Sequence, residues 1–270
     1  MFDPPIHSTH QLMSVEPNFL IIGANKAGTT SLYHYLKVHP DIFMSNIKEP
    51  LYFANREHES TIYDTKWCHG ATNKTDLLKK MLEGYSGEKW FGEASTMYAG
   101  QADYAIAPNG VVVHDLEKRI QESQPNMKFI YVLRHPMDRM LSQYAYAKKT
   151  GSNTPPFNVA VHEGYLEKSL YFFQLERYLK CFPRANLKIL IFEEFLTDIA
   201  GTLTDIFRFL DIEEIDLSGE KFIATNQTPR NDNDTFSLES FEKLIGPITE
   251  DVAKMEKFLG RSLNWDLEIR

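Results

Sequence analysis

The fold of this 270-residue chain is decided by residues 18–31, NFLIIGANKAGTTS. The apolar first half is long enough for a buried strand, and Gly23 and Gly28 bound the turn that follows it. Apolar residues then recur at helical spacing over Thr29–Val38, and Pro40 ends the pattern. The stretch therefore predicts a strand, a glycine-bounded turn and a helix.

Strands and helices alternate along the rest of the chain. Apolar runs of strand length occupy residues 89–94, 128–133 and 187–192. Amphipathic helical patterns cover residues 136–148, 168–181, 196–210 and 238–259. This alternation is typical of a central parallel β-sheet that is flanked by helices on both faces. We therefore expect a single α/β domain over residues 18–270, preceded by an N-terminal arm over residues 1–17.

The composition is that of an ordinary globular protein. Hydrophobic residues make up 43% and charged residues 24%, which excludes wholesale disorder and fibrous classes. A net charge of −8 excludes a generic nucleic-acid coat but allows a local basic pocket. The two cysteines, Cys68 and Cys181, are too few for a disulfide framework. No apolar run reaches the roughly 20 residues of a membrane span, and residues 1–17 lack a signal-peptide pattern. We expect a cytoplasmic protein without nucleic-acid or membrane partners.

The turn between Gly23 and Gly28 is a candidate anion site. Its backbone N–H groups and the helix N-terminus after it would face an anion, and Lys26 adds a cation. A Walker loop places its lysine after the second glycine, whereas Lys26 stands two residues before Gly28. The glycine spacing alone is a weak signal, so a plain turn with helix-capping threonines stays open as an alternative.

A second candidate anion site follows the strand at 128–133. A nucleotide-hydrolysing enzyme would place a magnesium-binding carboxylate there, but the strand ends in Arg134. This favours a second phosphate bound directly by protein, without a metal. An arginine at this place would bind a phosphate bidentately, and Ser142, two turns into the next helix on the face of Asp138 and Arg139, would add a hydroxyl. The alternative is an arginine that caps strand-end carbonyls and a serine packed against a neighbouring helix.

The two segments FLIIGANKAGTTSLYHYLKVHPDI and FIYVLRHPMDRMLSQY together resemble the sulfotransferases that use 3′-phosphoadenosine 5′-phosphosulfate (PAPS). The resemblance is closest to the heparan-sulfate-type and bacterial members, and it covers about residues 18–212. It implies a fold like that of the P-loop nucleotide kinases and PAPS as sulfuryl donor. It also implies that Arg134 and Ser142 hold the 3′-phosphate. The 5′-phosphosulfate would then be held by Lys26, Ala27, Gly28, Thr29, Thr30 and Ser31.

The segment VHPDIFMSNIKEPLYF resembles the part of the family that carries the catalytic base, which places Glu49 in that role. A carboxylate on a strand stiffened by Pro50 would accept the hydroxyl proton of the acceptor. Lys26 fits the leaving-group role, because an ammonium stabilises the charge that develops on the bridging oxygen. Without the resemblance, Glu49 would be interpreted as a surface residue paired with Lys48. Histidines serve as bases in other branches, but His39 is expected at a helix end and His114 in a loop.

The chain departs from the family at Ala94, where glycan-type members often have a lysine. Either Lys26 suffices, or Lys48 or Arg230 takes its place. Glu93 and Ser95 would line the acceptor site or satisfy backbone groups at a strand end. Arg230 lies in the polar loop 226–233, which position alone marks as the segment that closes over the adenine.

The acceptor is expected to be a small molecule from natural-product biosynthesis or a glycan, sulfated on a hydroxyl rather than an amine. The net charge of −8 argues against a highly sulfated polymer. A P-loop nucleotide kinase and a non-catalytic nucleotide-binding module are the alternative functions. Aromatic side chains near the expected site would stack on an acceptor or, more simply, fill the core: Tyr52, Phe53, Tyr98, Tyr144 and Tyr171.

Overall fold

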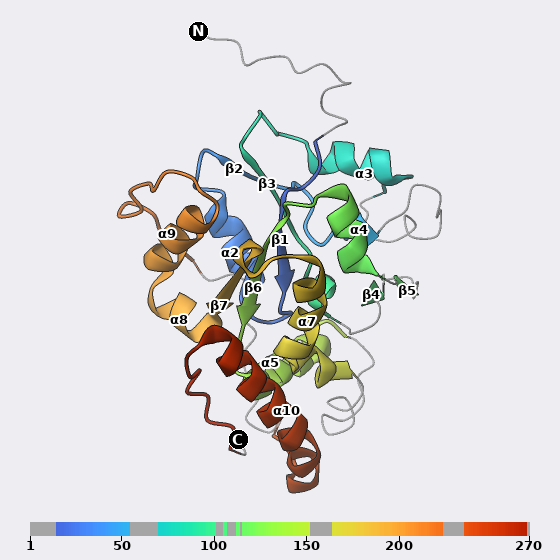
Figure 1. Cartoon of the computed structure of the whole chain (residues 1–270), viewed down its shortest axis with the longest axis vertical. Helices are drawn as coiled ribbons and strands as arrows, with labels where there is room; N and C mark the ends of the chain where they lie inside the picture. Colours follow the sequence, from blue (N-terminus) through green and yellow to red (C-terminus); the bar gives the residue numbers. More distant parts are fainter. Residues whose placement is uncertain are drawn as a thin grey trace.

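The structure is a computed structural model, and its described residues are 15–54, 70–100, 105–106, 112–113, 115–151, 164–223 and 235–268. A five-stranded sheet with the order β2-β3-β1-β6-β7 forms its centre (Figure 1). Every neighbouring pair in this sheet is parallel. The strands are β1 (Phe19–Gly23), β2 (Ile42–Met44), β3 (Trp90–Ala94), β6 (Lys128–Leu133) and β7 (Leu187–Ile191).

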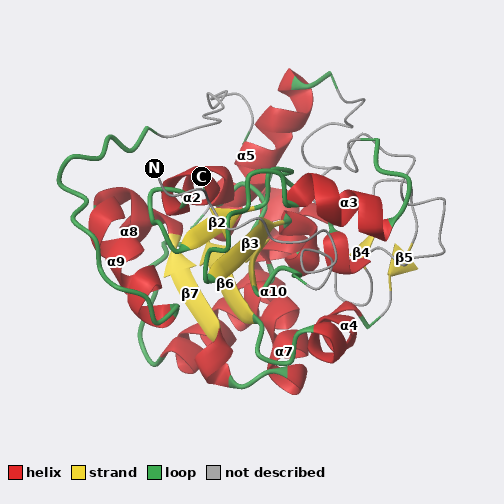
Figure 2. Cartoon of the chain, turned by 90° about the horizontal axis from the view of Figure 1, so that it is seen from above, coloured by secondary structure: helices red, strands yellow, loops and turns green. Residues whose placement is uncertain are grey.

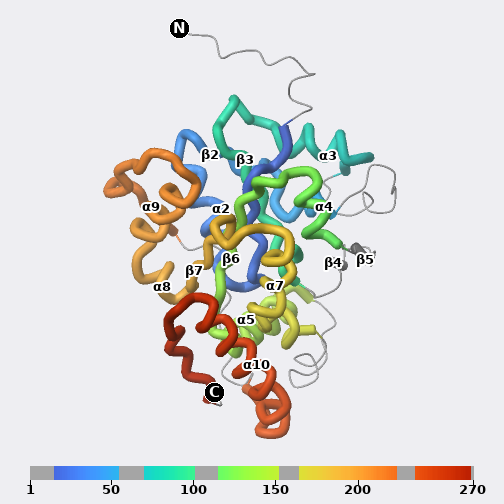
Figure 3. The backbone as a smooth tube through the Cα atoms, viewed as in Figure 1, coloured from blue at the N-terminus to red at the C-terminus, as the bar shows by residue number. Residues whose placement is uncertain are grey.

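The central strand β1 joins segments that are far apart in sequence. Phe19 pairs with Gly92 of β3 on one side and with Lys128 of β6 on the other. Figure 3 shows this neighbourhood as the blue β1 beside the green β6. All five residues of β1 are buried, because helices cover both faces of the sheet and leave no solvent side for polar residues.

Helices lie on both sides of the sheet (Figures 1 and 2). On one side lie α2 (Thr29–Leu36), α8 (Phe192–Thr197) and α9 (Ile199–Phe209). On the other lie α4 (Leu116–Ser123) and α7 (Tyr171–Cys181), with α10 (Leu238–Leu259) packed outside α7. The buried Asp251 of α10 accepts hydrogen bonds from Phe172 N and Phe173 N at 3.0 and 2.9 Å, which joins α10 to the first turn of α7.

The remaining elements are short, apart from one helix. Helix α5 (Pro136–Lys149) follows β6 directly, and α3 (Lys74–Met81) lies beside the 3₁₀ turn η1 (Tyr52–Ala54). Three other 3₁₀ turns are η3 (Thr96–Ala99), η5 (Glu167–Ser169) and η6 (Arg184–Asn186). A separate two-stranded ribbon consists of β4 (Ala105–Ile106) and β5 (Val112–Val113).

The predicted α/β architecture is confirmed, with differences at particular elements. The helix expected over residues 196–210 is wrong: the structure has α8 and α9, separated at Asp198, whose carboxylate accepts a hydrogen bond from Gly201 N at 2.8 Å and starts a new helix. The helix expected to reach Val38 ends at Leu36. β2, α3 and α4 were not expected from the sequence, because they are short and carry few buried residues.

The described residues before residue 18 already pack against the domain. Val15 packs against the core, and Glu16 accepts a hydrogen bond from Tyr52 OH at 2.6 Å. Lys74 lies 3.8 Å from the same carboxylate. Residues 1–14 of the expected arm lie outside the described residues. Among the helices that are described, none combines the length and apolarity that crossing a bilayer would require.

Candidate functional site

Residues 24–28, the phosphate turn, connect the end of β1 to the start of α2. Lys26 and Gly28 both have left-handed backbones, with φ of 69° and 81°. At Gly28 any side chain would also meet Phe192, because an added Cβ would lie 2.8 Å from the Phe192 ring. Glycine is therefore required here by conformation and by space. Ala27 is fully buried, and its N–H donates to the Ala24 carbonyl at 3.1 Å.

The two predicted cations meet at this turn. Arg134 follows β6, the neighbour of β1, and its Nη1 donates to the carbonyl oxygen of Lys26 at 2.9 Å. Its guanidinium also lies over the Phe192 ring at 4.7 Å. Tyr171 OH donates to the Arg134 carbonyl at 2.6 Å, which fixes the backbone where β6 ends. Lys26 and Arg134 therefore share one region at the carboxyl edge of the sheet, as the sequence predicted.

This region carries a surplus of positive charge. Burial, together with the charges of Arg134, Lys149, Arg139 and Lys48, lowers the pKa of Lys26 to about 8. The Lys26 ammonium lies 4.0 Å from the centre of the Tyr146 ring. An ammonium that is partly desolvated among other cations is stabilised by a bound anion. The residues present thus fit the phosphate groups of a nucleotide.

Helix α5 carries the other predicted phosphate ligand, Ser142, which is half-buried. Arg139 on the same helix points inward and is fully buried. Its guanidinium donates to Ser169 Oγ, Gln143 Oε1 and the Tyr165 carbonyl, each at 2.6 Å. Arg139 therefore joins α5 to η5. Thr29 and Ser31 are buried in the first turn of α2, while Thr30 is half-buried.

Glu49 lies on a bend rather than on the expected strand, because β2 already ends at Met44. Its Oε2 accepts a hydrogen bond from Thr96 N at 2.7 Å, and its Oε1 lies 2.9 Å from Lys48 Nζ. Thr96 Oγ1 in turn accepts from Asn25 Nδ2 at 3.5 Å. This chain of contacts connects Glu49 to the phosphate turn. The pairing with Lys48 that the sequence offered as an alternative is therefore present, together with the contact to Thr96.

Asn25 and Thr96 carry no sequence signal that would mark them as site residues. Each is an ordinary polar residue, and their contact joins positions 71 apart in the chain. Lys149 and Tyr146 were also missed, because they occupy the exposed end of α5, where lysine and tyrosine are common.

Of the alternative bases and cations, the structure describes His39 but not His114 or Arg230. His39 is buried at the end of α2: its Nδ1 accepts from Asp41 N at 3.1 Å, so its Nε2 donates to the Glu213 carbonyl at 2.7 Å. Both ring nitrogens are thus engaged in structural bonds, as expected for a helix-end residue. His114 and Arg230 lie outside the described residues.

Glu93 and Ser95, which were expected to line the acceptor site or to satisfy backbone groups, lie in the interior next to the end of β3. Both are fully buried; Ser95 Oγ accepts a hydrogen bond from Leu51 N at 3.0 Å, and the Glu93 carboxylate accepts hydrogen bonds from the hydroxyls of Ser95 and Tyr98. The aromatic residues that were expected mainly in the core are all buried there: Tyr52, Phe53, Tyr98, Tyr144 and Tyr171.

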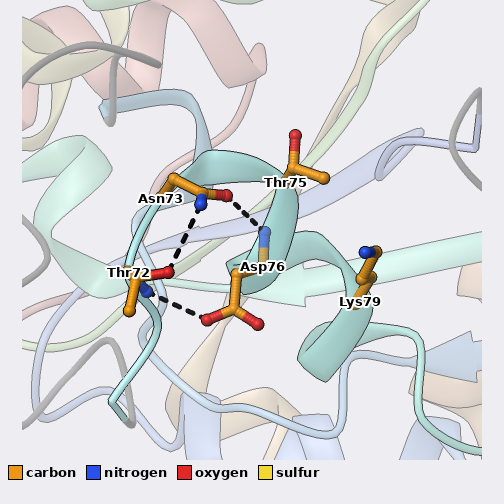
Figure 4. Close-up of a pocket in the computed structure, with 5 residues that line it drawn as sticks. All are labelled: Thr72, Asn73, Thr75, Asp76 and Lys79. Carbon is orange, nitrogen blue, oxygen red and sulfur yellow. Dashed lines mark hydrogen bonds between the residues drawn. The ribbon is translucent and has the colours of Figure 1, made fainter.

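A hollow of about 640 Å³ lies elsewhere, at the start of α3 (Figure 4). Its polar groups already cap the helix: Asp76 N donates to Asn73 Oδ1 at 2.8 Å, and Thr72 N donates to Asp76 Oδ2 at 2.9 Å. It contains none of the predicted site residues, so it is not part of the candidate site.

Comparisons with known proteins show the family of this chain. The family described as "Sulfotransferase domain" matches residues 16–226. Carbohydrate sulfotransferase 15 of Rattus norvegicus is 25% identical over 256 residues, which cover 77% of this chain and 46% of that protein. Heparan sulfate glucosamine 3-O-sulfotransferase 3A1 of Mus musculus is 26% identical over 223 residues, which cover 78% of this chain and 49% of that protein. The chain thus spans about half the length of these relatives.

Solved structures show the same fold. A sulfotransferase from Alicyclobacillus acidocaldarius has a TM-score of 0.69 and 27% identity, with 92% of this chain and 98% of that one covered. Mouse sulfotransferase SULT7A1, complexed with PAP, has a TM-score of 0.52 and 14% identity, and the match covers 91% of this chain and 87% of that one. The fold is therefore that of the P-loop-like sulfotransferases. The chain belongs to the sulfotransferase family, which confirms the resemblance stated for the segments around Lys26 and Arg134.

Proposed function

We propose that this chain transfers the sulfuryl group of PAPS to a hydroxyl of a small-molecule or glycan acceptor. The observation that carries the proposal is the meeting of Lys26 and Arg134 at one edge of the sheet, with Glu49 connected to the same turn through Thr96. Family membership supports the reaction class. PAP, which is PAPS without its sulfuryl group (3′-phosphoadenosine 5′-phosphate), is bound in a relative of the same fold. This supports PAPS as the donor.

The proposed roles follow from charge and position. The phosphate turn and Lys26 bind the 5′-phosphosulfate, and Arg134 with Ser142 binds the 3′-phosphate. The acceptor oxygen forms a bond to sulfur as the bond from sulfur to the 5′-phosphate oxygen breaks, in line with the attack. Glu49 takes the proton of the acceptor hydroxyl. Lys26 stabilises the negative charge that develops on the departing oxygen, and PAP is the second product.

Lys48 is our proposed substitute for the lysine that Ala94 replaces. Its ammonium lies 2.9 Å from Glu49 Oε1, and its charge helps to lower the pKa of Lys26. Its charge therefore acts on both the proposed base and the proposed leaving-group cation. A hydroxyl acceptor of the natural-product class and a cytoplasmic location remain predictions of the sequence.

The test is transfer itself. The purified protein is incubated with PAPS and a panel of small alcohols, amines and neutral sugars, and mass spectrometry detects any product that has gained one sulfuryl group. A sulfated product that requires PAPS and forms without ATP supports the proposal. Phosphorylation that requires ATP and magnesium would instead favour a nucleotide kinase. PAP binding without transfer to any acceptor would favour a binding module.

A further inference from the structure

Residues 49–53, the base segment, hold an unfavourable backbone conformation. Glu49 and Leu51 have φ of 59° and 51°, on either side of Pro50. A residue with a side chain pays about 1–2 kcal/mol for such a left-handed conformation. Two such residues so close together persist only where surrounding contacts impose them. The position of the Glu49 carboxylate therefore depends on what holds this segment.

The segment is held by β3 and the η3 turn. Glu49 N donates to the Ala94 carbonyl at 3.0 Å. Leu51 N donates to Ser95 Oγ at 3.0 Å, and Phe53 N donates to Tyr98 OH at 3.1 Å. Two side-chain hydroxyls thus accept backbone N–H groups of the base segment.

Both hydroxyls donate to one carboxylate, that of Glu93. Ser95 Oγ donates to Glu93 Oε1, and Tyr98 OH donates to Glu93 Oε2 at 2.6 Å. A hydroxyl has a single proton, so the carboxylate decides the direction in which each hydroxyl points. With both protons directed at Glu93, the lone pairs of both oxygens face Leu51 N and Phe53 N.

Glu93 is fully buried, and no cation in the described ranges forms an ion pair with it. Its pKa is raised to about 7, because burial and, to a smaller extent, the charge of Glu49 outweigh the lowering effect of the hydrogen bonds from Ser95 and Tyr98. A buried carboxyl without a cation is costly to keep. Packing alone would be served better by an apolar residue at this position.

We propose that Glu93 is a positioning residue for sulfuryl transfer, which through the hydroxyls of Ser95 and Tyr98 holds the base segment and so aims the Glu49 carboxylate. The inference rests on the proposed role of Glu49. Glu93 itself touches neither donor nor acceptor. Its effect belongs to turnover rather than to nucleotide binding, because neither hydroxyl bond involves Lys26 or Arg134.

The first experiment compares Glu93→Gln with Asp251→Asn. Both changes replace a buried carboxyl by an amide, but Asp251 holds the start of α7 and has no contact with the base segment. An amide NH₂ at position 93 reverses one of the two hydroxyls. We expect Glu93→Gln to lower kcat by roughly 10- to 100-fold at pH 8, as displaced catalytic groups do. The dissociation constant of PAP is expected to stay within about twofold, a threshold set by the usual spread of remote substitutions.

Asp251→Asn should lower the melting temperature and leave kcat within about twofold of the parent. A purely structural Glu93 would behave in the same way. Equal kcat for the parent, Glu93→Gln and Asp251→Asn would therefore overturn the proposal.

A double-mutant cycle tests whether Glu93 acts through Glu49. If it does, Glu93→Gln should cost little further turnover once Glu49 is glutamine, because there is no base left to aim. The same fractional loss in both backgrounds would overturn the positioning role while leaving Glu49 as the base. Full activity of Glu49→Gln alone would instead refute the proposed function of Glu49.

Ser95→Ala and Tyr98→Phe keep the test open if Glu93→Gln does not fold. Each removes one hydroxyl and leaves the carboxyl in place. We expect either change to lower kcat with the PAP dissociation constant unchanged. Full turnover of both variants would overturn the proposal.

Discussion

Lys26 is the residue on which the charge balance of the site depends. Its ammonium is partly buried among Arg134, Lys149, Arg139 and Lys48, which together with burial bring its pKa to about 8. A dianionic phosphate beside it favours the protonated form, so binding and protonation of Lys26 are linked. The site is thus arranged to be completed by an anion.

This linkage predicts how PAP affinity depends on pH. In the protein without nucleotide the pKa of Lys26 is about 8. Below that pH, Lys26 is already charged, so its titration does not change the affinity for PAP. Above it, a proton must be taken up on binding, so the dissociation constant should rise with pH, by up to about tenfold per pH unit. Calorimetric titration with PAP between about pH 7 and 9 measures the slope.

Lys26→Arg is the matched control, because a guanidinium stays charged throughout this range. The variant should bind PAP with a nearly pH-independent constant. An unchanged affinity of the parent protein across the range would contradict the perturbed pKa of Lys26.

Replacement of Glu49 by Gln separates binding from chemistry. The amide preserves the size of the side chain but cannot take a proton from the acceptor. We expect turnover to fall by about 10²–10⁴-fold, the usual contribution of general-base catalysis, with PAP affinity nearly intact. Steady-state kinetics and calorimetry on the same preparation measure the two effects. Unchanged turnover would remove Glu49 from the mechanism.

At this scale, sequence reasoning could find only residues that belong to local motifs. Lys26 and Arg134 each sit next to an apolar strand, and the resemblance assigned them before any contact was known. The contact of Asn25 with Thr96 and the bonds of Ser95 and Tyr98 to the base segment join positions tens of residues apart. Such contacts depend on the register of β3 beside β1, which a single sequence does not encode in any local pattern.

Among the elements, the turn from β1 to α2 shows most clearly how local structure builds the site. Gly28 combines a left-handed φ of 81° with close approach to the Phe192 ring, and Arg134 lies over the same ring. A side chain at position 28 would push Phe192 and thereby disturb Arg134. The phosphate turn and Arg134 are thus mechanically connected through this ring.

Gly28→Ala is therefore expected to lower both stability and PAP affinity. The left-handed backbone alone costs about 1–2 kcal/mol. Gly260→Ala is the control, since Gly260 has a similar φ of 69° and open space around it. The melting temperature should be lower in both variants, whereas calorimetry should find weaker PAP binding only for Gly28→Ala. Equal PAP affinity of the two variants would contradict the coupling through Phe192.

Elements were predictable in proportion to their length and pattern. Helix α10 and strand β6 have the bounds that their periodicity predicted, Leu238–Leu259 and Lys128–Leu133. β2 has only three residues and is recognisable only by its pairing with β3. The break between α8 and α9 was missed because apolar spacing continues through it, while the capping bond of Asp198 interrupts the backbone.

In the whole molecule, the strand order brings the site together. β1 lies between β3 and β6, so the phosphate turn, Arg134 and the segment that fixes Glu49 all start from neighbouring strands. The class of fold followed from the alternation of strands and helices, but the order of the strands did not. The buried Glu93 lies in this central region and connects the stability of the domain to pH.

Stability should therefore fall as Glu93 ionises in the folded state. Its folded pKa of about 7 is above the usual 4.5, so its stabilising contribution is complete below pH 4.5 and lost as pH rises through about 7. The shift corresponds to roughly 3 kcal/mol. Relative to Glu93→Gln, which does not titrate, the parent should lose stability over this window in denaturant unfolding. A pH-independent difference between the two proteins would contradict the raised pKa.

The most direct measurement of the central claim is calorimetric binding of PAP and of adenosine 5′-phosphate to the parent protein and to Arg134→Ala. If Lys26 and Arg134 hold opposite ends of one nucleotide, the parent should bind PAP roughly 100-fold more tightly than the nucleotide without the 3′-phosphate. Arg134→Ala should lose most of that preference, while Arg261→Ala, which removes an exposed arginine paired with Glu194, should keep it. Equal affinity of the parent for the two nucleotides would contradict the account.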